Sequence, residues 1–194
     1  ITYTAIDQCL NQSDMSFEVV VRDNTDPVAI CDQFNTVSIR EDGQSFITAQ
    51  SIDDGSYDAC GDVTLKIRRM SDPCNTGQDL DWFDSVDFCC LDANTQPMIA
   101  LLVTDKGGNT NICMVSVNVQ DKINPTIACP ADTIIRDCLF TFDPSESGAN
   151  HAFGAPVITD NCPSNVLVFH ELQDNRSQCG TGEVVRTMGV VLNG

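Results

Sequence analysis

Histidine, lysine and aromatic residues are scarce in this chain. Its 194 residues include two His, three Lys, one Trp and two Tyr. No Cys-x-x-Cys pair and no Gly-x-Ser-x-Gly elbow occur, so zinc, redox-motif and serine-hydrolase centres are not favoured. No apolar run approaches the ~18–20 residues of a membrane helix, so we expect no direct membrane insertion. One Trp and two Tyr are also few for a sugar-binding platform.

Positive charge is the second shortage. Ten Lys and Arg stand against 28 Asp and Glu, which gives a net charge of −18. Nucleic-acid binding needs clustered Lys and Arg, so this composition argues against nucleic acid and, equally, against an anionic membrane surface. Asp outnumbers Glu by 23 to 5. Asp suits turns and also ligates calcium, so its excess indicates either solvated loops or metal sites.

Cysteine, in contrast, is abundant, with 11 in 194 residues. Without zinc motifs, this number predicts a disulfide framework and hence an oxidising, extracellular setting. An odd number is expected if some partners lie in a longer parent protein. The candidate bridge residues are Cys31, Cys60, Cys74, Cys89, Cys90, Cys113, Cys129, Cys138, Cys162 and Cys179.

A motif occurs twice, without a gap, at an offset of 98 residues. Such a period predicts a tandem array of small domains. The aligned pairs are Asp7 with Asp105, Asn11 with Asn109, Val19 with Val117, Val21 with Val119, Asp23 with Asp121, Pro27 with Pro125 and Cys31 with Cys129. We therefore predict the last hairpin of a preceding unit (1–22), a complete unit (23–120) and the first part of a following unit (121–194), all within a longer protein.

Strand patterns dominate and no segment of ten or more residues has helical periodicity. Cys113, Val115, Val117 and Val119 alternate with polar residues, which is typical of a half-buried strand. The turn Asp105–Asn109 predicts a hairpin. Short strands between Gly, Pro and Asp turns predict an all-β, antiparallel β-sandwich. The expected strands are 1–6, 15–21, 28–31, 36–40, 46–49, 63–68, 82–91, 99–104, 112–119, 126–129, 166–170 and 183–191, with loops at 51–62 and 70–81.

The run Phe88-Cys89-Cys90 constrains the disulfides. Successive strand residues point to opposite faces, so Cys90 shares the expected core face of Phe88 and Cys89 faces outwards. Cys90 should then reach a buried partner and Cys89 a surface loop. The candidate partners are Cys113 for Cys90, and Cys74 or Cys60 for Cys89. Six cysteines in one unit allow 15 pairings, so these alternatives stay open.

Several of these motifs together resemble the hyalin-repeat (HYR) family. The resemblance rests on Asp105–Asn109, Cys113, Val115–Val119, Gln120-Asp121, Asn124-Pro125, Thr126–Pro130 and Asp160-Asn161-Cys162. Trp82–Cys90 is similar to the variant in giant type IX-secreted surface adhesins of Bacteroidota, among them gliding-motility adhesins and hook- or fibre-forming proteins. The resemblance implies tandem immunoglobulin-like β-sandwich domains with an adhesive or structural role, and it supplies no catalytic residues. The chain departs from the pattern at Leu10 and Asp32, and its last unit lacks the final Asp turn.

Two groups of oxygen-bearing residues are candidate calcium ligands. One lies at the predicted domain joints and comprises Asp23, Asp26, Asp121 and Asn124. The other lies in a loop and comprises Asp53, Asp54 and Asp58. Calcium takes six to eight oxygen ligands, and neither group has the EF-hand spacing. The alternative is that the joint aspartates cap turns by accepting hydrogen bonds from backbone amides.

These features predict a non-enzymatic segment of a long extracellular fibre at the cell surface, built from disulfide-stapled repeats, which attaches to surfaces or other cells. The alternative is a carbohydrate-binding or accessory module array of a secreted enzyme. His151 and His170 belong to no catalytic constellation, and we expect both to be surface or packing residues. The expected partners are neighbouring repeats, further copies in an oligomer or filament, surface glycans, and prey or host cell surfaces.

Overall fold

The computed structural model describes residues 1–136, 154–163, 166–178 and 180–192. Two predicted bridge residues, Cys138 and Cys179, and also His151 lie outside these ranges. The strands are β1 (Thr2–Ile6), β2 (Gln12–Ser16), β3 (Asn35–Ser38), β4 (Gln44–Thr48), β5 (Thr64–Arg69), β6 (Ser85–Cys89), β7 (Met98–Thr104), β8 (Thr110–Gln120), β9 (Thr126–Ala128), β10 (Val157–Thr159), β11 (Val166–Asp174) and β12 (Val184–Leu192). The helical elements are α1 (Ala49–Ile52) and the 3-10 turn η1 (Cys90–Asp92). The described chain is therefore all-β, as predicted.

Two sheets pack on one core in the middle region. The larger sheet has the order β3-β8-β7-β5, and β4 pairs with β6 in the smaller one. Apolar side chains from both sheets and from α1 form one buried cluster. Its members are Val37, Ile39, Ile47, Ala49, Ile52, Ile67, Val86, Phe88, Ile99, Leu101, Val103, Val115, Val117, Val119 and Cys162. A sandwich-like arrangement follows, because each sheet buries its apolar face against the other.

The predicted alternation in β8 is confirmed. Val115, Val117 and Val119 are buried, whereas Met114 and Ser116 are exposed. The expected hairpin is also present, because β7 pairs antiparallel with β8 across the turn at residues 105–109.

The two copies of the repeated turn have the same hydrogen bonds. Asp105 accepts hydrogen bonds from the backbone N–H and the side-chain amide of Asn109, both at 2.8 Å. Asp7 accepts the same two bonds from Asn11, at 2.9 and 2.8 Å. The sequence match at this turn therefore corresponds to one local structure.

One pairing differs from the antiparallel prediction, because β3 pairs with β8 in parallel. The N–H of Ile39, just after β3, donates to the carbonyl of Gln120 at the end of β8. Both strands thus run towards the end of the unit where the chain leaves it. When a unit is entered at one end and left at the other, its first and last strands point the same way, and neighbouring strands then pair in parallel.

Several predicted element bounds also change. The expected strand 28–31 makes only isolated bridges, from Val28 to Tyr57 and from Cys31 to Asp53. The loop expected over 51–62 begins only after Ile52, because helix α1 includes its first two residues. Thr48 and Ser51 cap this helix reciprocally. The strand expected over 82–91 occupies only Ser85–Cys89, and η1 begins at the next residue, Cys90.

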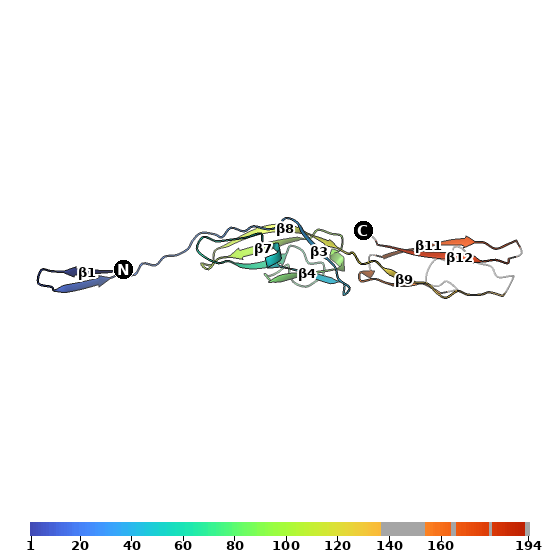
Figure 1. The fold of residues 1–194 in the computed structure, drawn as a ribbon, viewed down its shortest axis with the longest axis horizontal. Helices are drawn as coiled ribbons and strands as arrows, with labels where there is room; N and C mark the ends of the chain where they lie inside the picture. Colours follow the sequence, from blue (N-terminus) through green and yellow to red (C-terminus); the bar gives the residue numbers. More distant parts are fainter. Residues whose placement is uncertain (137–153, 164–165, 179, 193–194) are drawn as a thin grey trace.

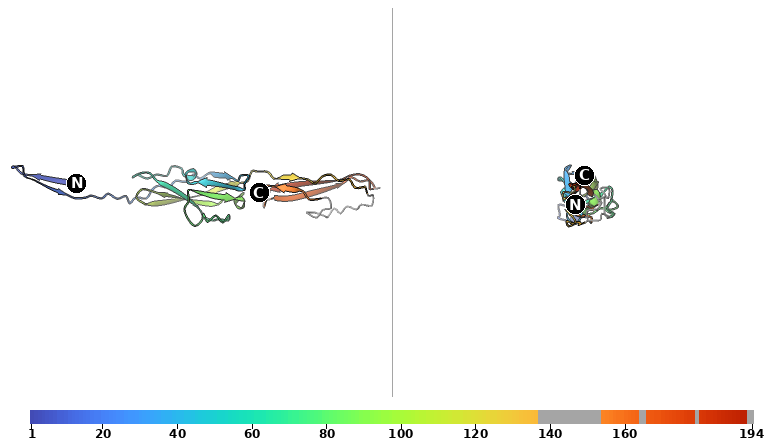
Figure 2. Two further views of the ribbon diagram at one scale, coloured as in Figure 1. Left: turned by 90° about the horizontal axis from the view of Figure 1, so that it is seen from below. Right: turned by 90° about the vertical axis from the view of Figure 1, so that its right-hand side faces the viewer.

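The three predicted regions follow one another along the long axis of the molecule (Figures 1 and 2). At the N-terminal end, β1 and β2 form a hairpin whose residues are all exposed. Its return strand occupies Gln12–Ser16 rather than the predicted 15–21. At the other end, β9 pairs with β10 and β11 with β12. No helix among the described residues is long and apolar enough to cross a membrane.

Candidate functional site: the joint after residue 120

A disulfide crosses the predicted boundary between residues 120 and 121. Cys90 of the middle unit is bonded to Cys162 of the following one, with Cα atoms 5.3 Å apart. The bridges Cys31–Cys113 and Cys74–Cys89 stay within the middle unit. Of the two candidate partners for Cys89, which were Cys74 and Cys60, the structure has Cys74. The joint is thus covalently closed by a bond between two predicted units.

Cys113, the candidate partner for Cys90, is not bonded to it, and the end of β6 explains why. The prediction required Cys90 to continue the alternation of the strand. The strand instead ends at Cys89, and Cys90 opens the turn η1, where the backbone changes direction. Cys113 pairs with Cys31, 82 residues earlier. The expectation of a buried partner still holds, because Cys162 is fully buried.

Gly43 allows the two units to approach at this bond. It lies in the turn before β4 and has φ +74°, a conformation that residues with a Cβ rarely adopt. A Cβ here would lie 3.0 Å from the carbonyl oxygen of Asn161 and 3.3 Å from the Cys90 sulfur. The turn therefore needs glycine both for its backbone conformation and for the contact across the joint.

Asn161 adds hydrogen bonds across the same joint. Its side-chain amide donates to a carboxylate oxygen of Asp121 at 3.1 Å and to the carbonyl of Arg40 at 3.3 Å. The same oxygen of Asp121 accepts the N–H of Ile123 at 3.1 Å. Asp121 therefore caps the linker turn, as one of the two sequence interpretations expects, and it also anchors the Asn161 loop.

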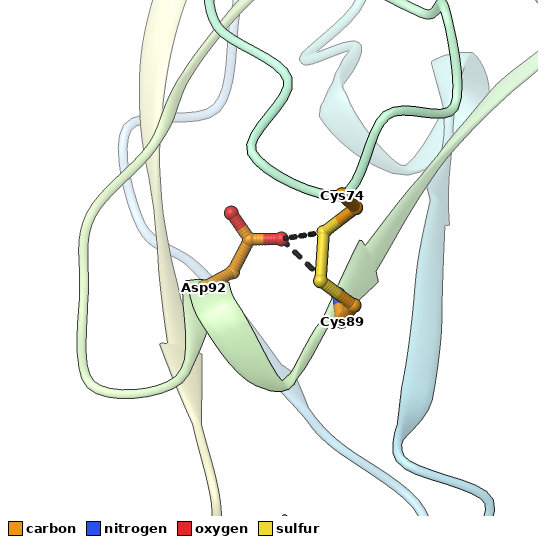
Figure 3. A group of neighbouring side chains, drawn as sticks. All are labelled: Cys74, Cys89 and Asp92. Carbon is orange, nitrogen blue, oxygen red and sulfur yellow. Dashed lines mark hydrogen bonds between the residues drawn. A yellow bond between two sulfur atoms is a disulfide. The ribbon is translucent and has the colours of Figure 1, made fainter. Parts of the chain in front are cut away.

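A buried ion pair supports the cysteine side of the joint. The carboxylate of Asp92, in η1, is 2% exposed and binds the guanidinium of Arg69 through both oxygens. One of these oxygens accepts the N–H of Cys89 and lies 3.1 Å from the sulfur of Cys74 (Figure 3). These contacts fix η1 against the Cys74–Cys89 bridge. Cys74, Cys89 and Asp92 are close enough to hold a metal, but the two cysteine sulfurs are bonded to each other and provide no thiolate.

The structure places the predicted calcium ligands in different ways. In the loop group, Asp53 accepts backbone N–H groups of Gly55 and Ser56, and Asp54 is exposed. In the joint group, Asp26 and Asn124 are exposed.

One pair from the two predicted groups does come together. Ligand atoms of Asp23 and Asp58 lie within 4.8 Å of each other and of the Cys60 thiol. Asp23 accepts the N–H of Thr25 at 3.0 Å, so it also caps its linker turn. A soft thiol beside two carboxylates is a poor donor set for calcium, which prefers oxygen.

Three oxygen atoms at the second joint are buried without a hydrogen-bond partner among the described residues. They are one carboxylate oxygen each of Asp121 and Asp160 and the amide oxygen of Asn161. Buried polar atoms in proteins almost always have a partner, so such atoms call for an explanation. The sequence interpretation included Asp121 but not Asp160 or Asn161, although the Asp160-Asn161-Cys162 motif was a signal for that loop.

Three cysteines of the described residues are unpaired and exposed, namely Cys9, Cys60 and Cys129. Cys60 and Cys129 were both expected to be bridged, and neither has a partner among the described residues. Cys74, one candidate partner of Cys89, is bonded to it, which leaves Cys60 unpaired.

No known family model matches the chain, and no curated protein sequence is significantly similar to it.

Proposed function

We propose that this chain is a non-enzymatic segment of a long extracellular fibre at the cell surface, in which disulfide-stapled, immunoglobulin-like units follow one another. In this proposal the fibre attaches the cell to surfaces or to other cells. The observation that carries the proposal is the Cys90–Cys162 bridge across the joint. A covalent bond between consecutive units limits their separation under load, which benefits a tether more than an enzyme.

Attachment under flow tests this function. The chain is attached to beads by its termini, and the fraction of beads retained under flow is measured on glass, polystyrene and bacterial cells. Retention should exceed that of beads carrying an unrelated β-sandwich of equal charge. A chain that is not retained on any of these surfaces, but binds soluble glycans, would support a carbohydrate-binding module instead. The guanidinium of Arg68 lies 4.8 Å from the ring centre of Trp82 and covers one face of the only tryptophan, which disfavours that alternative.

We also propose that a calcium ion binds at the second joint. The unpartnered oxygens of Asp121, Asp160 and Asn161 support this, because calcium takes carboxylate and amide oxygens. A 3.1 Å hydrogen bond joins the side chains of Asn161 and Asp121, and Asp160 directly precedes Asn161 in the chain. When bound, calcium would neutralise the two carboxylates and stiffen the linker.

Calcium titration against a chelator tests this site through the melting temperature. A ligand bound only by the folded state, at 100 times its Kd, stabilises that state by about 2.7 kcal/mol. Asp160→Asn should abolish the calcium-dependent rise in melting temperature. Asp54→Asn removes an equal charge from an exposed carboxylate away from the joint and should preserve the rise. A rise that is unchanged in Asp160→Asn would place the ion elsewhere.

A further inference from the structure

The unpaired thiol of Cys60 lies at the first predicted joint. Cys60 is exposed and lies beside Asp23, the first residue of the predicted middle unit. Its N–H donates to a carboxylate oxygen of Asp58 at 2.6 Å, which holds the loop in a tight turn. The thiol therefore faces the end of the unit at which the chain enters.

The same arrangement recurs at the second joint, with the cysteine bonded. The N–H of Cys162 donates to Asp160 at 3.1 Å, as that of Cys60 donates to Asp58. The Cys162 loop contacts Asp121 through Asn161, as Cys60 contacts Asp23. Cys162 is bonded to Cys90 of the unit before it. The Cys162 copy of this loop therefore forms an inter-unit disulfide, whereas the Cys60 copy has a free thiol.

We propose that Cys60 is the acceptor for a second inter-unit disulfide, formed with a cysteine of a preceding unit that occupies the position of Cys90. This inference rests on the proposed function, because it needs units in series. The partner surface should present a cysteine at the start of a 3-10 turn and, beside it, a turn with glycine at the position of Gly43. Repeated along a fibre, the bond would link each unit covalently to both neighbours.

The bond forms by oxidation of two thiols. Each thiol loses one proton and one electron, and a sulfur–sulfur bond forms. A small-molecule disulfide such as oxidised glutathione accepts both electrons and both protons and leaves as two thiols, by exchange through a mixed disulfide.

The surroundings of Cys60 favour a partner that is held in place. A hydrogen bond to Asp23 and the negative charge of that carboxylate, with smaller contributions from Asp58 and Asp105, hold the pKa of the Cys60 thiol above its usual range. The thiolate is the attacking species, so random exchange at neutral pH is slow. Ala59 stands where the second joint has Asn161, so the first joint lacks that side-chain amide and depends more on its disulfide.

A duplication within the full chain tests the inference. A second copy of residues 23–120 is inserted between Gln120 and Asp121, which joins Gln120 to Asp23 and preserves the natural Gln-Asp junction. The insertion adds six cysteines. If the inference holds, the number of reactive thiols stays unchanged after oxidative refolding. Peptide mapping should then find Cys90 of the first copy bonded to Cys60 of the inserted copy.

Two additional thiols, or a different partner for Cys90 of the first copy, would overturn the inference. Cys60→Ser in the inserted copy is the matched control and should expose one new thiol. The Cys31–Cys113 and Cys74–Cys89 bridges, mapped in both copies, report that each has folded. Small-angle scattering tests the proposed function separately, because a series of units must lengthen by one unit whether or not the new bond forms.

A second measurement covers the case in which the duplicated chain does not fold. The protein is isolated from its source cells without reductant and treated with iodoacetamide. Cys60 should resist alkylation until a reductant is added, whereas Cys60 recovered as an alkylated thiol would overturn the inference.

Discussion

The disulfides should make this chain nearly inextensible, and the effect can be calculated from their positions. Load that enters at Cys31 crosses to Cys113, runs back along the chain to Cys90 and crosses to Cys162. Residue numbers give 23 residue steps on this path, against 131 steps along the chain from residue 31 to residue 162. The Cys74–Cys89 bridge lies off the path and does not change it.

The extended lengths follow from the steps. At about 3.4 Å per residue, 23 steps span roughly 80 Å and 131 steps roughly 450 Å. If only the inter-unit bridge is removed, load crosses from Cys31 to Cys113 and then follows 49 steps to residue 162, or roughly 170 Å. Cys90→Ser with Cys162→Ser should therefore lengthen the unfolded path by roughly 90 Å, and full reduction by roughly 370 Å.

Single-molecule pulling measures these lengths. Force is applied between the N-terminus and an unnatural amino acid at the exposed position Pro163. The parent chain and the variant with Cys90→Ser and Cys162→Ser are compared. Both also carry Cys138→Ser and Cys179→Ser, so that no bridge from these two cysteines shortens the path. Equal contour lengths in the two proteins would refute the inter-unit bond. With the alternative bridge from Cys90 to Cys113, and with Cys74–Cys89 retained, the path in the parent protein would have 93 steps, or roughly 320 Å.

Three further predictions concern single residues. Gly43→Ala and Gly55→Ala both place a Cβ at positive φ, which should cost about 1–2 kcal/mol of stability each, but of the two only Gly43 has neighbours within 4 Å of that Cβ. Urea unfolding should therefore show the larger loss of stability for Gly43→Ala. Equal losses in the two variants would contradict the contact at Gly43. Asp92→Ala leaves the buried guanidinium of Arg69 unpaired and should cost about 3–5 kcal/mol of stability in the same assay. A loss below about 1 kcal/mol, the value typical of an exposed pair, would show that the ion pair does not support the joint. Asp23→Asn removes the main cause of the raised pKa of Cys60, so the pH profile of Cys60 alkylation should move to lower pH, and an unmoved profile would show that the carboxylate does not reach the thiol.

Local features of the fold could be predicted from the sequence. The alternation in β8, the hairpin turn at residues 105–109 and the outward direction of Cys89 all follow from steric rules between near neighbours in the chain. The repeat also located the loop of Cys162, because Asp160–Cys162 matches Asp58–Cys60 at an offset of 102, with about four extra residues inserted before it. It could not identify the partner of either cysteine.

The tertiary structure alone decided what joins distant segments. The parallel pairing of β3 with β8 has no local signature, because either direction would satisfy the same alternation along each strand. The direction of Cys90 depends on where β6 ends, and Asp92 sets that end through its buried contacts with Arg69 and with the N–H of Cys89. The bond to Cys162 then depends on a glycine 47 residues before Cys90, since only a turn without a Cβ lets the next unit approach the sulfur. Such contacts arise from packing in three dimensions, which neighbouring residues in a sequence do not encode.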